Sequence, residues 1–334
     1  MANVVRNSER GHDVSTIDEV SLLAGPGVRG YLDRLEELLQ RTVAYREGPA
    51  SEAAASTVTA GGKRLRPLLC YLSAADRDGD DLVRAGAAVE LVHSATLVHD
   101  DVLDEAPLRR GRPTVWATGG AELAVATGDY LFARAFGLLV ETGDADAVTE
   151  LADCALGLAQ GEAMQMLQAR DPRTTPEQYL ERCALKTGLL FATACALGAR
   201  LGGVPAEALP AVRRYGHDLG LAFQMADDVL DCAGSMESTG KPIGTDLLDG
   251  TASLPLIYAA RADAAVARAI AARPAPDEVL GLLARVAECG ALAEARAVAH
   301  DCARRAEAAL DDLDEHLDTR PLRAVVRGVV DREA

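Results

Sequence analysis

Long uncharged stretches are absent from this 334-residue chain. The longest runs from Thr187 to Ala199 and covers 13 residues, whereas a helix that crosses a bilayer needs about 20. The first residues, MANVVRNSERGHD, lack the apolar core of a secretory signal peptide. We therefore expect a cytoplasmic protein without a transmembrane segment.

Basic residues, and lysine above all, are scarce. The net charge is −17, which argues against nucleic acid as a partner because phosphate neutralisation requires a basic surface. Small anionic ligands remain compatible, since they respond to the local field of a cleft. Only three of the 34 basic residues are lysine, namely Lys63, Lys186 and Lys241. Unless these lysines survive by chance, they mark positions where a compact ammonium group is needed.

Cysteine pairs with metal-binding spacing are absent as well. The chain has seven cysteines, an odd number, and no CxxC motif. The sequence therefore predicts neither a disulfide framework nor a zinc site. We expect the cysteines to be small buried residues in a reducing compartment.

The alternation typical of β-strands does not occur over a useful length. Alanine and leucine favour helix throughout, so we expect an all-α protein with a flexible segment 1–18 and one domain over 19–334. A polar loop is predicted at 234–250. Helices are predicted at 27–46, from about 67, at 82–105, 121–141, 145–170, 176–202 and 206–233, and from about 252 onward.

The pentapeptide DDVLD occurs twice, at 100–104 and at 227–231. Residues four apart share a helix face, so the first and last aspartate of each copy project together. Each copy precedes a predicted helix end, where the helix dipole disfavours a carboxylate by roughly 0.3–1 kcal/mol. A solvated acidic end would explain one copy, but two copies on apolar helices indicate a bound hard cation such as Mg²⁺ or Mn²⁺. The candidate ligands are Asp100, Asp101, Asp104, Asp227, Asp228 and Asp231.

Cationic side chains that suit a diphosphate lie in several short segments. Glycines beside Lys63 and Lys241 would let backbone N–H groups approach phosphate oxygens. His93 lies two turns before Asp100 on the same predicted face, whereas His99 should point elsewhere. Each residue alone fits a solvated loop or a satisfied core position. The full set of candidates is Lys63, Arg66, His93, Arg109, Arg110, Lys186, Thr187 and Lys241.

These segments resemble the all-trans prenyl diphosphate synthases. The matches are GGKRLRP, VELVHSATLVHDDVLDEAPLRRGRPT, ATGDYLFARA, LKTG, FQMADDVLD and GKPIGTDL, in that order over about 61–257. The resemblance implies an all-α bundle around a deep central cavity, usually a homodimer, with the two acidic motifs facing each other. It also implies Mg²⁺, isopentenyl diphosphate and an allylic diphosphate as ligands.

The resemblance implies a role for each matching residue. Asp100, Asp104 and Asp227 would bind metal directly, with the other three aspartates in support. Arg109, Lys186 and Lys241 would contact the allylic diphosphate, whereas isopentenyl diphosphate would be held by Lys63, Arg66, His93 and Arg110. Thr187 and Gln224 would lie near the reacting carbons. One departure is Thr251, which stands where the family often has a lysine.

Product length is expected to depend on the helix that carries Asp100. A turn rises about 5.4 Å, comparable to one extended isoprene unit, so Ala95 and Thr96, then Val92, then Ala88 would act as successive stops. The two nearest are small, which favours a medium- to long-chain product unless these residues only pack against a neighbouring helix. Alternatives are a shorter-chain synthase of the geranylgeranyl type, a terpene cyclase, and a non-catalytic subunit of a heteromeric synthase.

Overall fold

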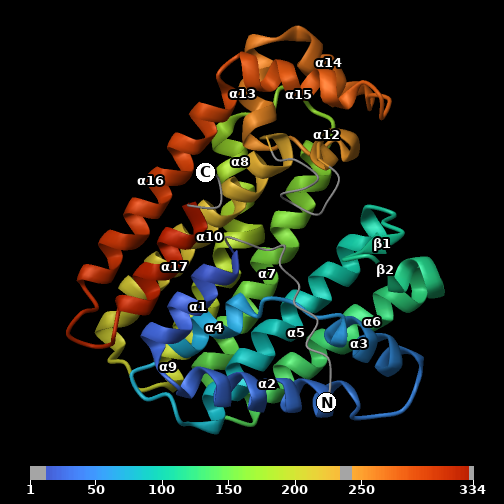
Figure 1. Ribbon diagram of the computed structural model, residues 1–334. Helices are drawn as coiled ribbons and strands as arrows, with labels where there is room; N and C mark the ends of the chain where they lie inside the picture. The colour runs from blue at the N-terminus through green and yellow to red at the C-terminus, as the bar shows by residue number, and fades with distance from the viewer. Residues whose placement is uncertain (1–12, 234–242, 331–334) are drawn as a thin grey trace, which may run out of the picture.

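The computed structural model describes residues 13–233 and 243–330. Over these ranges the chain is almost entirely helical (Figure 1), as predicted. The first half contains α1 (Asp13–Ala24), α2 (Gly27–Val43), α3 (Pro49–Thr59), α4 (Leu65–Leu72), α5 (Asp80–Leu103), α6 (Val115–Val140) and α7 (Ala145–Gln168). The segment after α7 forms α8 (Pro176–Cys183), a π-helical turn η1 (Ala184–Gly188) and α9 (Leu189–Leu201). The second half contains η2 (Ala206–Ala208), α10 (Leu209–Ala233), α12 (Thr245–Asp249), α13 (Leu254–Ala262), α14 (Ala264–Ala272), α15 (Val279–Glu288), α16 (Ala291–Asp311) and α17 (Arg320–Val330).

The predicted boundaries hold within a few residues for the long helices, but four features differ. Helix α1 begins at Asp13, inside the segment 1–18 that was expected to be flexible. Helix α3 was not predicted. The expected loop 234–250 contains the short α12, and a two-stranded hairpin, β1 (Leu108–Arg109) and β2 (Arg112–Pro113), follows α5.

Close approach of the central helices depends on small residues. A Cβ atom on Gly198 of α9 would lie 1.9 Å from the carbonyl oxygen of Cys70 on α4. A Cβ on Gly216 of α10 would lie 2.7 Å from the Cα of Ala192 on α9. Glycine is therefore required at both contacts, and the backbones of α4, α9 and α10 pack directly against one another.

Helices α5 and α10 carry the two DDVLD motifs, and both end near short connecting elements (Figure 1). Helix α5 ends before the β1–β2 hairpin, and α10 runs toward α12. Both motifs thus lie at carboxyl-terminal helix ends, as the sequence predicted. All seven cysteines are free, six of them buried and Cys289 partly buried.

Two helical segments, Val115–Val140 and Pro176–Leu201, are long and apolar enough by composition to cross a membrane. The sequence analysis missed these two segments because it considered only runs without any charged residue, and a few charged residues interrupt both helices. In the second segment 67% of the apolar window is buried. Its apolar composition is therefore that of a helix in the protein core. In the first only 39% is buried, so α6 keeps an uncovered apolar side.

Candidate active site

The first acidic cluster divides into three environments at the end of α5. Asp101 is only 4% exposed and accepts a hydrogen bond from Arg109 of the hairpin, with Nε to Oδ1 at 2.7 Å. Asp100 is partly buried, and its Oδ2 lies 3.6 Å from Nζ of Lys186. Asp104 caps the helix and is exposed. Asp100 and Asp104 therefore keep exposed surface, while the buried Asp101 is bonded to the hairpin.

Helix α7 adds an acidic residue that the sequence analysis missed. Glu162 forms an ion pair with Lys186, which in turn faces Asp100. Gly161 permits this, because a Cβ there would lie 2.9 Å from the backbone nitrogen of Lys186. A glycine directly before an acid on an apolar helix was the only signal in the sequence for this close contact.

The carboxylates of the first cluster are held in their protonated form more readily than usual. Burial raises the pKa of Asp100 to about 7, and the nearby Glu162 and Asp104 carboxylates add to the shift, while Lys186 opposes it. Burial, together with Asp249 and Glu162, raises the pKa of Asp104 as well. Burial and mutual repulsion thus disfavour the charged form of these carboxylates, and a nearby cation would favour it.

The second acidic cluster is anchored by its middle and last aspartates. Asp228 is 5% exposed and accepts hydrogen bonds from the Tyr179 hydroxyl at 2.6 Å and from the Gln224 amide at 2.8 Å. Asp231 accepts from the backbone N–H groups of Thr245 and Asp246, both at 3.1 Å. These contacts fix the end of α10 against α8 and α12.

The first aspartate of this cluster differs from the other two. Asp227 is exposed, whereas burial raises the pKa of Asp228 to about 6 and also raises that of Asp231. Burial, with Asp228 and Asp231 close by, raises the pKa of Asp246 well above its usual range. Asp246 is a further acidic group of this cluster that was not among the predicted site residues.

A π-helical turn connects the two clusters. Lys186 and Thr187 are neighbours in η1. Lys186 faces Asp100 at the end of α5. The Thr187 hydroxyl donates to Oε1 of Gln224 at 2.9 Å, and Gln224 in turn donates to Asp228 on α10. Single π-helical turns are frequent at functional sites.

The predicted basic residues gather beside the first cluster. A pocket there is lined by His93, Arg109 and Arg110, together with Gly61 of the GGKRLRP segment. The Arg110 guanidinium donates to the Gly61 carbonyl oxygen. Lys63 is exposed in the same segment. Lys241 lies outside the described residues.

Arg66 and His93 are partly buried basic candidates whose pKa values are lowered. Burial lowers the pKa of Arg66 to about 10, against the opposing effect of Glu90 and Asp227. Its guanidinium lies 4.7 Å from the ring centroid of Phe191, and its Nε has no hydrogen-bond partner. Burial, and next the arginines led by Arg66, lower the pKa of His93 well below its usual range. The buried Arg66 Nε is therefore a donor available to a ligand oxygen.

The residues proposed to set product length are mostly covered. Ala88, Val92 and Ala95 have no exposed surface. Thr96 is partly exposed, and its hydroxyl donates to the His93 carbonyl oxygen at 2.8 Å. Only Thr96 of this set borders open space in the structure.

Arg170 approaches the segment in which Thr251 replaces the expected lysine. Its Nη2 lies 3.4 and 3.1 Å from the carbonyl oxygens of Leu248 and Asp249, and its backbone N–H donates to Gly250. Arg170 has a positive φ of 59°. This guanidinium brings a positive charge to the segment that the side chain of Thr251 does not supply.

The oxygen-only donor set fits Mg²⁺ or Mn²⁺ in kind. Asp100, Asp104 and Asp227 offer carboxylate oxygens near two helix ends. Over 13–233 and 243–330, no three acidic, histidine or cysteine side chains already converge on one point. A hard ion that shares its coordination with substrate phosphates does not require such convergence.

Comparisons with known proteins identify the family of the chain. The sequence profile of the polyprenyl synthetase family matches residues 49–281. The chain belongs to the polyprenyl synthetase family. Its all-helical fold and its assignment as a prenyl-transferring enzyme follow from this membership.

Individual members of the family bear names that span several product lengths. The chain is 42% identical to a "Heptaprenyl diphosphate synthase component 2" from Geobacillus stearothermophilus, over 72% of this chain and 76% of that protein. It is 35% identical to a "Short chain isoprenyl diphosphate synthase" from Methanothermobacter thermautotrophicus, over 83% and 88%. The crystal structure of a decaprenyl diphosphate synthase from Rhodobacter capsulatus superposes with a TM-score of 0.83 at 32% identity, over 95% of this chain and 99% of that chain.

Proposed function

We propose that this enzyme adds isopentenyl diphosphate repeatedly, head to tail, to an allylic diphosphate and forms a medium- to long-chain all-trans polyprenyl diphosphate. The observation that carries the proposal is the η1 turn. It brings Lys186 to the first acidic cluster and Thr187 to the Gln224–Asp228 pair of the second. One site thus combines two sets of carboxylates with the basic pocket beside α5.

Mg²⁺, or Mn²⁺ in its place, would be held by Asp100, Asp104 and Asp227, with Asp101, Asp228 and Asp231 in support. It would supply the positive charge that stabilises the departing diphosphate as the allylic C–O bond breaks.

The basic side chains divide into two groups by position. Lys186 and Arg109, which contact Asp100 and Asp101, would bind the allylic diphosphate together with Lys241. Lys63, Arg66, Arg110 and His93 would bind isopentenyl diphosphate in the neighbouring pocket. Held there, the double bond of isopentenyl diphosphate attacks the allylic carbon, a C–C bond forms, and the proton that leaves is taken up by the released diphosphate. The Phe191 and Phe223 rings, 5.4 Å apart, would help to exclude water.

The names of the relatives leave product length and assembly open within this proposal. A shorter, geranylgeranyl-type product is the first alternative, because a relative named for short chains matches the sequence over most of its length. A homodimer is the proposed assembly, in the cytoplasm. A heteromeric synthase is the alternative, because one relative is named as a component.

The test is release of diphosphate by the purified chain with Mg²⁺. A synthase requires both isopentenyl diphosphate and an allylic starter, a cyclase requires only the allylic substrate, and an isolated component of a heteromer releases none. Mass spectrometry of the dephosphorylated product then gives the chain length. Full turnover in excess EDTA would overturn the metal assignment.

A further inference from the structure

The backbone of the GGKRLRP segment is strained at a residue with no role in the proposed chemistry. Arg64 has φ 49° and ψ 35°, a left-handed conformation, directly before α4. For a residue other than glycine this conformation is strained and persists only where the surroundings enforce it. Lys63 precedes Arg64 and Arg66 follows two residues later, so the conformation of Arg64 sets the directions in which both leave the backbone.

The Arg64 side chain turns inward and uses its whole guanidinium group. Its Nη1 donates to Oε1 of Glu90 on α5 at 2.6 Å, and its Nε donates to Oε1 of Glu36 on α2 at 2.6 Å. Its Nη2 reaches Oε2 of Glu36 at 3.2 Å and the Val58 carbonyl of α3 at 2.9 Å. Arg64 is 9% exposed and Glu90 is 5% exposed. Three helices are therefore joined through one planar group, which a lysine would not reproduce.

Glu90 places a negative charge in a pocket that is otherwise basic. It lies one turn before His93 and lines the same basic pocket as Arg109 and Arg110. A carboxylate in a pocket for a diphosphate repels that ligand, so the simplest electrostatic expectation is that Glu90 weakens binding. A carboxylate at this position makes sense if Glu90 binds Arg64 of the loop and does not contact the ligand.

We infer that Arg64 and Glu90 form a positioning brace: the buried pair holds the Lys63–Arg66 turn in the geometry that grips isopentenyl diphosphate, and keeps the Arg64 charge away from the ligand. The opposite end of the turn is fixed by Arg110, which donates to Gly61. This inference rests on the proposed function, because it takes isopentenyl diphosphate as the occupant of the basic pocket.

The sign of one substitution separates the brace from simple electrostatics. Glu90→Gln removes a negative charge but keeps the shape. If Glu90 only repels the ligand, the dissociation constant for isopentenyl diphosphate falls. If Glu90 holds the loop through Arg64, the dissociation constant rises, and we expect a rise of about tenfold. Arg64→Lys keeps the charge but loses the fork, and should produce a rise of the same size.

The double variant tests whether the two residues act as one unit. Because Arg64→Lys and Glu90→Gln break the same contact, their combination should weaken binding no more than either change alone. Additive effects, or tighter binding by Glu90→Gln, would overturn the brace. The KM for the allylic substrate should stay within twofold of the wild type in all three proteins.

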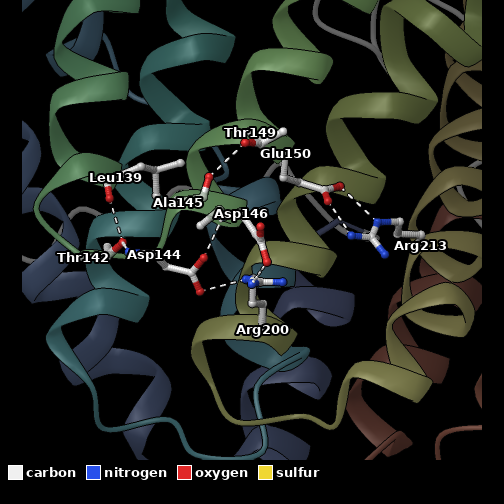
Figure 2. A network of polar contacts seen from close by, with 10 residues as sticks. Leu139, Thr142, Asp144, Ala145, Asp146, Thr149, Glu150, Arg200 and Arg213 are labelled. Atoms are coloured by element: carbon white, nitrogen blue, oxygen red, sulfur yellow. Dashed lines mark hydrogen bonds and ion pairs between the residues drawn. The ribbon is translucent and has the colours of Figure 1, made fainter.

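A matched control comes from a second arginine that forms ion pairs with two aspartates (Figure 2). Arg200 on α9 donates from Nε to Asp144 at 2.8 Å and pairs with Asp146 at the start of α7. Arg200→Lys removes a comparable fork, so it should lower the melting temperature without changing either substrate constant. An equal change in isopentenyl diphosphate binding by Arg200→Lys would show a general loss of structure and would also overturn the brace.

Binding is measured by calorimetry on the full chain with isopentenyl diphosphate alone, so no turnover is needed. Failure of the wild type to bind isopentenyl diphosphate, or to release diphosphate with both substrates, would refute the proposed function. Wild-type binding with unchanged or tighter binding by Glu90→Gln would refute only the brace.

Discussion

Burial of the Asp100 carboxylate lowers the free energy of unfolding when this group is ionised. The pKa of Asp100 rises to about 7 because the side chain is buried, and Glu162 lies close by. An aspartate in an unfolded chain titrates near 3.9. Between about pH 4 and pH 7 the folded protein therefore binds more protons than the unfolded chain, and the free energy of unfolding falls as the pH rises through this range.

Asp100→Asn should accordingly stabilise the protein while it destroys catalysis. In EDTA at pH 8 we expect the melting temperature to rise by roughly 1–3 °C, with little difference from the wild type near pH 4. Turnover with Mg²⁺ should fall by at least about a hundredfold. Asp144→Asn is the control: Asp144 pairs with Arg200, and its pKa is lowered chiefly by hydrogen bonds to Arg200 and Ala147 against the effect of burial. That change should lower the melting temperature at pH 8 and leave turnover intact.

The two residues expected to limit product length, Ala95 and Thr96, differ in burial. Thr96 is partly exposed, so Thr96→Phe places a ring into open space and should shorten the product while diphosphate release continues. Ala95 has no exposed surface, and Ala95→Phe should cost about 1–3 kcal/mol of stability by overpacking. Mass spectrometry of the products, with Thr96→Ser as the control, checks this. An unchanged product distribution from Thr96→Phe would mean that this position does not limit chain growth.

At the scale of elements, the sequence predicted what depends on local pattern. The long helices and the carboxyl-terminal positions of both DDVLD motifs followed from helical periodicity and from breakers such as Pro107. His99 turns away from the site toward the Val125 carbonyl on α6, as its place on the helix predicted. These features need no knowledge of the tertiary structure.

Features that depend on contacts between distant segments were not predictable. The π-helical turn at 184–188 has no special composition that would reveal it in the sequence. Its role follows from the contacts of Lys186 with α5 and α7. Glu162 and Glu90 resemble ordinary helix residues in the sequence. Their roles come from the lysine and the arginine that the fold brings to them.

Helix α6 is kinked at Gly120. Gly120 has φ 80° and ψ 175° inside the helix, and no atom lies within 4 Å of an added Cβ. Gly120→Ala should therefore destabilise the protein through backbone strain alone, by about 1–2 kcal/mol. Because Thr114 and Val115 before the kink line the basic pocket, the KM for isopentenyl diphosphate should also rise several-fold.

Gly30→Ala on α2 is the matched control for this substitution. Gly30 lies in helical backbone and is likewise free of atoms within 4 Å of an added Cβ. Alanine there should be neutral or stabilise by up to about 1 kcal/mol. Thermal unfolding of both variants decides the matter. Equal melting temperatures would show that the kink relaxes without strain.

For the whole molecule, one helical face is left uncovered by the residues that the structure describes. Helix α6 is apolar, yet only 39% of its apolar window is buried. Val125 on α6 is 45% exposed, and Leu156 on the following α7 is 61% exposed. We expect these side chains to belong to one apolar patch, because large exposed apolar patches mark interaction sites. The proposed homodimer would cover this face, since a twofold axis pairs the same surface on both copies.

The mass in solution should therefore be about twice the 35.0 kDa of the chain. Light scattering of the purified protein measures it directly, and Val125→Glu combined with Leu156→Glu should shift the protein to the monomer by placing unpaired charges in the interface. Leu280→Glu is the control, because Leu280 is 66% exposed on α15, which lies away from α6 in Figure 1, and the change should leave the dimer intact. A monomeric wild type that releases no diphosphate would instead favour a heteromeric synthase, in which the uncovered face of α6 binds a different chain.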